Sequence, residues 1–251
     1  MTISYGGDNM MQCSTSPVTL NADNPLSVMK RYELKYIIDE KQTDYLLDSL
    51  KGRIKPDQFG LTTISSLYYD TPDSLLIRTS VEKPGFKEKI RLRSYGPATV
   101  SSPVFLELKR KAYGVVYKRR VKATIPAAED FFAYRGALPS GQIGREITSF
   151  RDHYVTLVPS CLVMYDRTAY FEPGGDLRLT IDRDPRFRTD ALDLTLPAEG
   201  ASLLPPGCSV LELKVQDAIP LWLSGILANG GIYKTSFSKY GEAYRRTLFK
   251  I

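Results

Sequence analysis

The sequence is poor in the residues that build metal centres and disulfide frameworks. Its three cysteines, Cys13, Cys161 and Cys208, are far apart and form no Cys-x-x-Cys pair. This spacing argues against a zinc site or a disulfide-stapled fold and favours a reducing compartment. The single histidine, His153, cannot supply a catalytic triad or a His-based metal centre without other partners. Its place in a helical-looking stretch favours a structural or solvent role.

Long apolar runs and nucleotide-binding loops are also missing. No segment approaches the apolar length needed to cross a bilayer. The polar N-terminus lacks the basic region and apolar core of a signal peptide. No Gly-rich loop carries the Lys-Ser/Thr of a P-loop, and no nucleophile stands out beside a base. We therefore expect a disordered leader, 1–28, followed by one domain, 29–251.

The composition is that of a soluble globular protein with a moderate basic excess. The 251 residues are 43% hydrophobic and 25% charged. Lys and Arg number 34 against 28 Asp and Glu, which gives a net charge of +6. This excess is too small for a chromatin-type basic tail but suggests an anionic partner.

Charged residues recur at a two-residue period in strand-like segments. A strand sends successive side chains to opposite faces, so such a segment has one charged and one largely apolar face. The strongest stripe is Lys87, Lys89, Arg91 and Arg93. The same alternation occurs in 31–36, 106–111, 117–122, 177–182 and 211–214. In one strand, a solvated face is the commoner explanation. Six strands rich in Arg, Lys and Glu favour a closed antiparallel barrel with a charged lumen and helices outside.

Turn and capping signals divide the chain into alternating elements. Strands are expected at 30–38, 65–70, 86–95, 104–112, 115–125, 161–171, 177–183, 191–196 and 209–215. Helical segments are expected at 39–50, 74–80, 127–135, 144–157, 220–228 and 239–249. The short link at Tyr113-Gly114 predicts a hairpin. These elements indicate an α+β fold.

Cations that converge from several strands suit a ligand with many phosphate oxygens. Glu33, Glu107 and Glu212 would neutralise part of that field or hold a hard divalent metal through oxygen. The simpler alternative is that each Glu only pairs with a neighbouring Lys. For Glu212 we favour the metal role slightly. With no activated nucleophile, the chemistry indicated is phosphoryl transfer by positioning and charge stabilisation.

Nine short motifs carry a resemblance to a known family. They are 31–36 (RYELKY), 68–73 (YYDTPD), 89–95 (KIRLRSY), 107–111 (ELKRK), 117–120 (YKRR), 165–170 (YDRTAY), 178–182 (RLTID), 211–214 (LELK) and 238–240 (SKY). In this order the chain resembles, over 29–249, the VTC domain of vacuolar transporter chaperone polyphosphate polymerases. These belong to the CYTH-like triphosphate tunnel metalloenzymes.

The resemblance implies an eight-stranded antiparallel tunnel that transfers the γ-phosphate of ATP to a growing polyphosphate chain, with Mn²⁺ or Mg²⁺. By matching position, it implies a metal ligand at Glu212. The implied catalytic cations are Lys35, Arg91, Arg93 and Lys239. The implied substrate-binding residues are Lys109, Lys118, Arg167, Arg178, Lys214 and Ser238.

Two positions depart from the pattern. Tunnel hydrolases often begin with Glu-x-Glu-x-Lys, but the first position here is Arg31, which favours a polymerase over a triphosphatase. Position 236, where another basic residue is expected, is Ser236, and Lys234 is its substitute. Two alternatives stay open: a tunnel triphosphatase acting on inorganic or nucleoside triphosphate, and a non-catalytic polyphosphate-binding module.

Expectations about partners are less specific. Binding of nucleic acid is not expected, because Tyr32, Tyr36 and Tyr117 alternate onto the face opposite the charges. The chain resembles a stand-alone, bacterial-type form, which we expect in the cytoplasm. Basic residues of the last helix would offer a docking surface for a membrane-protein partner or the inner membrane face. The commoner explanation for such residues is a helix face exposed to solvent. They are Lys239, Arg245, Arg246 and Lys250.

Overall fold

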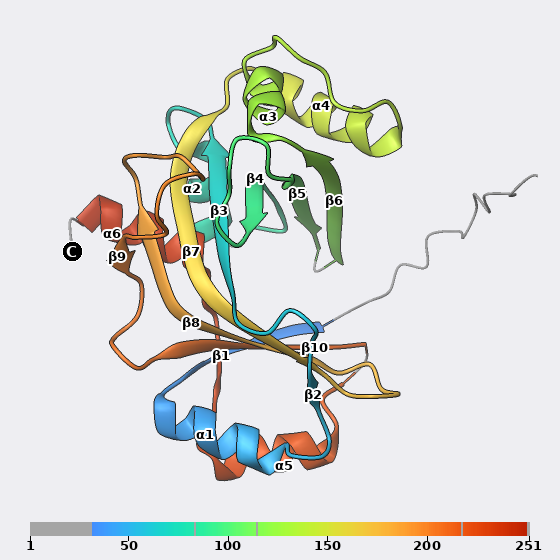
Figure 1. Cartoon of the computed structure of the whole chain (residues 1–251), viewed down its shortest axis with the longest axis vertical. Helices are drawn as coiled ribbons and strands as arrows, with labels where there is room; N and C mark the ends of the chain where they lie inside the picture. Colours follow the sequence, from blue (N-terminus) through green and yellow to red (C-terminus); the bar gives the residue numbers. More distant parts are fainter. Residues whose placement is uncertain (1–31, 83, 114, 217, 250–251) are drawn as a thin grey trace, which may run out of the picture.

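The chain folds around one large antiparallel sheet with helices packed on it, an α+β arrangement (Figure 1). The computed structural model describes residues 32–82, 84–113, 115–216 and 218–249. The longer strands are β1 (Tyr32–Ile38), β3 (Thr62–Asp70), β4 (Phe86–Tyr95), β5 (Val104–Ala112), β6 (Val115–Ala123), β7 (Val158–Phe171), β8 (Arg178–Arg188) and β10 (Ser209–Val215). The two-residue strands are β2 (Lys55–Pro56), β9 (Ala201–Ser202) and β11 (Lys234–Thr235). The helices are α1 (Glu40–Ser49), α2 (Leu75–Val81), α3 (Ile125–Phe132), α4 (Gln142–Tyr154), α5 (Leu221–Asn229) and α6 (Lys239–Phe249).

The sheet is open. Its strands follow the order β11-β1-β10-β8-β7-β3-β4-β5-β6, with β2 added to β7 and β9 to β8. Within the described residues β6 pairs only with β5. The closed eight-stranded barrel predicted from the sequence is therefore not confirmed, since the described sheet has eleven strands and does not close. One physical reason is that β11 pairs with Lys35 and Tyr36, on the edge of β1 that closure would need.

Curvature brings the two halves of this open sheet to face each other. Figure 1 shows the sheet turning from β4, β5 and β6 at the upper right, through the long strands β3, β7 and β8, to β1 and β10 below. Register shifts in β3 and β7 mark β-bulges, which bend a strand and increase its twist. Lys109 on β5 lies 3.6 Å from Glu33 on β1, although these strands are not neighbours in the sheet. The charged strand faces thus meet on a concave side.

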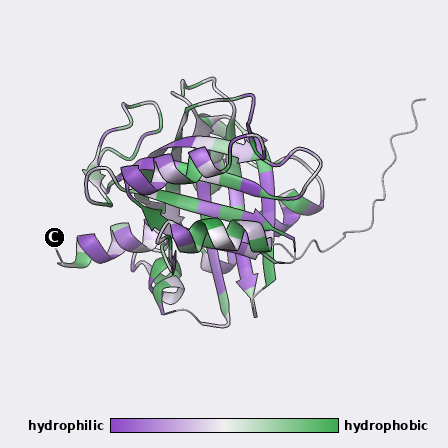
Figure 2. Ribbon diagram, turned by 90° about the horizontal axis from the view of Figure 1, so that it is seen from below, coloured by the Kyte–Doolittle hydropathy of each residue, from purple (hydrophilic) through white to green (hydrophobic). Residues whose placement is uncertain are grey.

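Apolar strand faces point to the convex side, where two helix pairs cover them. Leu106 and Leu108 pack with Phe150 in one cluster beneath α3 and α4. Leu46 and Leu211 belong to a second cluster beneath α1 and α5. Figure 2 shows hydrophilic and hydrophobic residues alternating along the strands. The strand alternation predicted from the sequence is therefore the alternation that the fold uses, with burial of the apolar faces supplying the main stabilisation.

A third apolar cluster fills one end of the concave side. It joins α2 and α6 to the inward residues of β3 and β7, with the Tyr68 and Tyr240 rings stacked 4.2 Å apart. Asp70 is fully buried and accepts hydrogen bonds from the Ile77 amide, 3.0 Å, and the Tyr240 hydroxyl, 2.8 Å. These bonds fix the start of α2 and the position of α6. Helix α6 therefore closes part of the concave side and leaves the rest to charged residues.

Most predicted elements are confirmed, with boundaries shifted by a few residues. The strand predicted at 191–196 is wrong, because the Arg188 side chain donates to the carbonyls of Ala191, Asp193 and Pro197 and holds the segment as a loop. The leader predicted at 1–28 lies outside the described residues. No helix among the described residues combines the length and the apolarity of a bilayer-spanning segment.

Candidate active site on the concave face

A buried carboxylate on β5 organises basic side chains of the two neighbouring strands, β4 and β6. Glu107 is 1% exposed and accepts two hydrogen bonds from Arg91, at 2.8 and 2.9 Å. Lys118 lies 2.9 Å and Arg93 3.7 Å from its oxygens. Arg120 donates its Nε at 2.7 Å. Burial alone would raise the pKa of Glu107, but the charges of Arg91, Arg93 and Lys118 hold this pKa well below its usual range. We call these five residues the Glu107 group.

Two further carboxylates lie side by side on β1 and β10. The Lys35 ammonium lies 3.2 Å from Glu33 and 3.8 Å from Glu212, and Lys214 lies 2.6 Å from Glu212. Burial and the Glu212 charge would raise the pKa of Glu33, but Lys109, Lys35 and Lys214 outweigh them and lower it. Burial would also raise the pKa of Glu212, but Lys214, Lys35 and Arg167 lower it further. Both groups are thus carboxylates at neutral pH.

The donor set fits a hard divalent ion only in part. Among the described residues, no group of three or more Asp, Glu, His or Cys side chains could hold a metal. Glu33 and Glu212 therefore offer two carboxylates, and Mg²⁺-type sites often use one or two carboxylates with substrate phosphates and water. The pair fits an ion that arrives with its anionic substrate.

Asp182 is a candidate site position that was not predicted from the sequence. It is fully buried and accepts from Arg167 at 2.5 and 2.8 Å and from Lys239 at 2.5 Å. Burial raises its pKa, but Lys239 and Arg167 lower it further than burial raises it. The sequence did indicate that Asp182 lies on the charged face of β8, because it is an even number of residues from Arg178. Asp182 positions two of the predicted phosphate-binding cations.

A cavity of about 690 Å³ lies beside Glu33, between β1, β4, β5 and α6. Its basic lining residues are Lys35, Lys87, Lys89, Lys109, Lys111, Lys234 and Arg245. Against these seven, Glu33 is the single carboxylate among the described lining residues. Lys89 donates to the Ser238 hydroxyl at 3.2 Å. Burial, and then the charges of Lys87 and Lys109, lower the pKa of Lys89 to about 7. The cavity is therefore an anion site by charge. We call it the cationic cavity.

The predicted site residues thus fall into connected sets. Lys35, Lys109 and Ser238 line the cationic cavity, and Arg91, Arg93 and Lys118 surround Glu107. Arg167 and Lys239 meet at Asp182, and Lys214 pairs with Glu212. Arg178 is exposed, opposite Lys214 in the sheet and 5.5 Å from the Phe171 ring. Arg120 and Lys89 were not predicted as site residues, although each shares a strand face with residues that were.

Aromatic side chains also lie on the charged face, which differs from the sequence expectation. Tyr95 continues the inward series of β4, and Phe105 lies opposite Arg93 on β5. The Arg93 guanidinium carbon lies 5.9 Å from the Tyr95 ring centre. The expectation rested on Tyr32, Tyr36 and Tyr117 and left out the strand ends, where Tyr95 and Phe105 are found.

The basic patch predicted on the last helix is not assembled as expected. Lys239 turns inward to Asp182. Arg245 and Arg246 bond Glu242, and Arg246 also donates to the carbonyls of Ser202 and Leu203. Lys250 lies outside the described residues. Docking on a membrane or a membrane protein stays a prediction, with less support from this helix.

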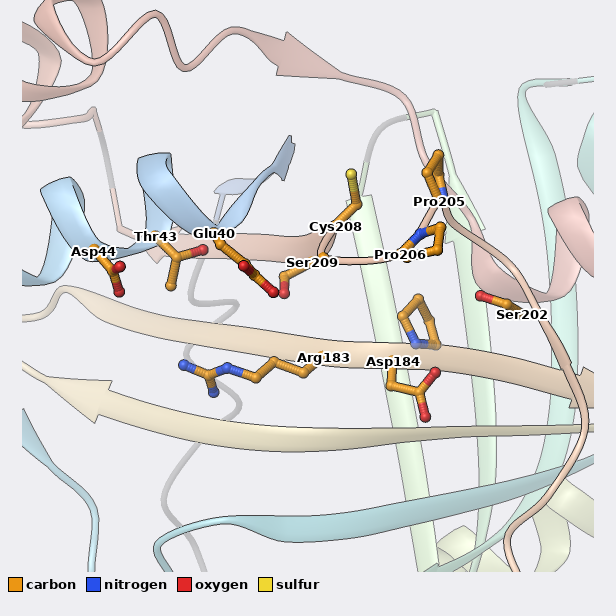
Figure 3. A pocket seen from close by; sticks show the side chains of 12 residues that line it. Glu40, Thr43, Asp44, Arg183, Asp184, Ser202, Pro205, Pro206, Cys208 and Ser209 are labelled. Atoms are coloured by element: carbon orange, nitrogen blue, oxygen red, sulfur yellow. The ribbon is translucent and has the colours of Figure 1, made fainter.

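A separate cavity of about 400 Å³ lies between α1, β8 and the segment 202–209 (Figure 3). Glu40, Asp44 and Asp184 give it an acidic lining beside Arg183. It contains none of the predicted site residues. Its charge is opposite to that of the cationic cavity, so a phosphate-rich ligand is not expected there.

Comparison with known families places the fold. A family model described as the VTC domain matches residues 30–248. The chain belongs to the VTC-domain family. Comparison with curated protein sequences found no match.

This VTC-domain protein is similar to several solved structures. A protein from Bacillus halodurans, named as a putative adenylate cyclase, matches with a TM-score of 0.52 at 13% identity, over 83% of this chain and 95% of that chain. A similarly named protein from Vibrio parahaemolyticus has a TM-score of 0.45 at 13% identity, over 85% and 97%. A protein from Hippeastrum, named as a putative adenylyl cyclase and described as having a dominant triphosphatase activity, has a TM-score of 0.47 at 19% identity, over 83% and 92%. Family membership and the first likeness support a triphosphate tunnel fold.

Proposed function

We propose that this VTC-domain protein is an ATP-dependent polyphosphate polymerase, which transfers the γ-phosphate of ATP to a growing polyphosphate chain on the concave face. The observation that carries the proposal is the cationic cavity, with its seven basic lining residues against Glu33. Such an excess of positive charge in a partly enclosed site favours a ligand with many negative oxygens. Membership in the VTC family adds that phosphoryl transfer or triphosphate hydrolysis is the chemistry to test.

Each basic group has a role that its position suggests. Arg91 and Arg93 present guanidinium groups that are already aligned by Glu107. Because phosphoryl transfer spreads negative charge over the transferred group, prealigned cations stabilise its transition state. Lys35 and Lys239 would add charge from the opposite wall. The proposed substrate-binding residues are Lys109, Lys118, Arg167, Arg178, Lys214 and Ser238.

Glu212, with Glu33 beside it, would hold a divalent ion, for which we propose Mn²⁺ or Mg²⁺. When bound, such an ion would neutralise charge on the phosphate oxygens. Lys35 lies near both carboxylates and compensates part of their charge. Glu212 is the better candidate because it is 7% exposed, so its charge is less screened by water.

A triphosphatase acting on inorganic or nucleoside triphosphate is compatible with the same site, because it would bind the same anion and transfer the phosphoryl group to water. A non-catalytic polyphosphate-binding module would use the same cations without turnover. The feature that favours a polymerase is Arg31 in the first motif, which lies outside the described residues.

The decisive experiment is to incubate the purified protein with ATP and Mn²⁺ and to measure product chain length on a gel. A polymerase yields a ladder of long polyphosphate together with ADP. Orthophosphate and ADP without a ladder would identify a triphosphatase. Unchanged ATP, together with retained polyphosphate in a filter-binding assay, would identify a binding module. An Arg91→Ala/Arg93→Ala variant is the control for a contaminating enzyme.

A further inference from the structure

Two aromatic rings end the cationic face at the side away from α6. Tyr95 is the last residue of β4 and is 44% exposed. Its ring meets the Phe105 ring edge-on, with centres 5.7 Å apart and planes at 78°. The Arg120 guanidinium lies 4.6 Å over Phe105, and its Nη2 donates to the Tyr95 hydroxyl at 2.6 Å. The Tyr95 ring is thus held from two sides and keeps exposed surface.

This position follows directly from the phosphate-binding stripe. Arg91, Arg93 and Tyr95 occupy alternate positions on the same face of β4. A strand rises about 3.4 Å per residue, so Tyr95 lies about 7 Å beyond Arg93 along the strand. A nucleotide whose phosphates lie on Arg91 and Arg93 would extend its nucleoside in one of the two strand directions. In the other direction lies Lys89, at the cationic cavity.

A ring fixed beside a cation-lined phosphate site is suited to a nucleobase. Base–aromatic stacking needs an open ring face, and it tolerates any base because every base has a π-face. The Arg93 and Arg120 guanidinium groups, 5.9 and 5.7 Å from the Tyr95 ring centre, add planar cations that also stack on bases. Inorganic triphosphate has no group that could use this surface.

We propose that Tyr95 is the stacking platform for the base of a nucleoside triphosphate, with Phe105 and Arg120 as its positioning residues. The proposal rests on the proposed function, since it assumes that the triphosphate lies on Arg91 and Arg93. It assigns the preference for a nucleotide over inorganic triphosphate to one side chain outside the phosphate-binding set.

The test is calorimetric titration with two ligands, the β,γ-imido analogue of ATP and inorganic tripolyphosphate. Tyr95→Ala should weaken binding of the ATP analogue about tenfold, which corresponds to about 1.4 kcal/mol, within the range found for base stacking on an aromatic side chain. It should change tripolyphosphate binding less than twofold. Tyr95→Phe keeps the ring and should retain most of the affinity for the analogue. Phe105→Ala should give a smaller loss with the same selectivity.

Tyr117→Ala is the matched control. Tyr117 is 43% exposed, close to the exposure of Tyr95, but alternates with Lys118 onto the other face of β6. This variant should bind both ligands as the wild type does. Melting temperatures of all variants check the fold.

The outcomes separate this proposal from the proposed function. If wild type binds tripolyphosphate but Tyr95→Ala weakens both ligands equally, or neither, the platform is rejected and the phosphate site stands. If wild type binds neither ligand, the proposed function is rejected and the platform with it.

Discussion

The two ends of the cationic face treat their charges differently. In the Glu107 group, one buried carboxylate on β5 holds the basic side chains of the two flanking strands, β4 and β6, in fixed directions. In the cationic cavity, basic residues converge with Glu33 as the only carboxylate among the described lining residues. The first arrangement aligns cations before a ligand arrives, and the second retains a positive field that a ligand would neutralise.

The difference is visible in the pKa values of Glu107 on β5 and Lys89 on the neighbouring strand β4. At Glu107 the surrounding cations lower a carboxyl pKa, which means that the ionised carboxylate is stabilised by its partners. At Lys89 burial and other cations lower an ammonium pKa to about 7, which means that the charged form is destabilised. Cations fixed by a buried carboxylate and cations destabilised by one another therefore occur on the same face, on neighbouring strands.

Glu107→Gln should lower the free energy of unfolding by about 3 kcal/mol, because it removes the counter-charge of cations that include the 6% exposed Arg93. Chemical denaturation measures the change. Glu33→Gln, with a side chain that is 31% exposed, should cost less than about 1 kcal/mol. Equal costs for the two variants would contradict the distinction between the two ends. Tripolyphosphate should restore part of the stability of Glu107→Gln, since its oxygens can replace the carboxylate.

Arg91→Ala and Arg93→Ala should each lower kcat/KM for ATP by about 10- to 150-fold, because a charge-assisted hydrogen bond contributes roughly 1.5–3 kcal/mol. Steady-state kinetics with thermal melting as a fold check measures this. Arg178→Ala, at an exposed position of β8, should cost less than about tenfold. Full activity in a folded Arg91→Ala/Arg93→Ala protein would reject the tunnel assignment.

Glu212→Gln should weaken Mn²⁺ activation about tenfold or more while nucleotide binding changes less, because the substitution keeps the shape and removes one charge of the carboxylate pair. Activity as a function of Mn²⁺ concentration, at saturating ATP, gives the activation constant. An unchanged Mn²⁺ titration would reduce Glu212 to an ion-pair partner of Lys214 and Lys35.

Lys89→Met should raise the melting temperature by about 2–4 °C at pH 6.5 and by less at pH 9.5. The pKa of Lys89 falls from 10.5 to about 7 on folding. Between these values the unfolded chain binds more protons, so the cost of Lys89 is greatest below pH 7 and disappears as the pH rises toward 10.5. Thermal melting without anions measures the difference, with Lys89→Arg as the charged control. A gain that is independent of pH would show that burial of the Lys89 charge is not its origin.

The sequence predicts the charged face well because its signal is local. A two-residue period depends only on strand geometry, so Arg91 and Arg93 were placed on the charged face of one strand and Lys118 on the charged face of another. Contacts between elements far apart in the sequence have no such signal. The link of Lys239 to Asp182 joins α6 to β8 and depends on how α6 folds back onto the sheet.

Closure of the sheet was also beyond the reach of the sequence. β11 is two residues long, too short for any periodicity, and yet it pairs with the edge of β1. The loop at 191–196 was mistaken for a strand because the sequence does not show that its carbonyls accept hydrogen bonds from the Arg188 side chain. In a strand they would accept from the backbone of a neighbouring strand. Tyr95 and Phe105 were overlooked because they stand at strand ends, just past the charged residues that define the stripe.

The central claim is that the concave face is a single site for a triphosphate or polyphosphate anion. Calorimetric titration with inorganic tripolyphosphate tests it most directly, on wild type, on Arg91→Ala/Arg93→Ala, and on Arg119→Ala as a control whose arginine pairs with Glu146 of α4 on the convex side. We predict one-to-one binding to wild type, an affinity lower by about 100-fold or more in the double variant, and no change in the control. The absence of binding to wild type, or an equal loss in Arg119→Ala, would contradict the account.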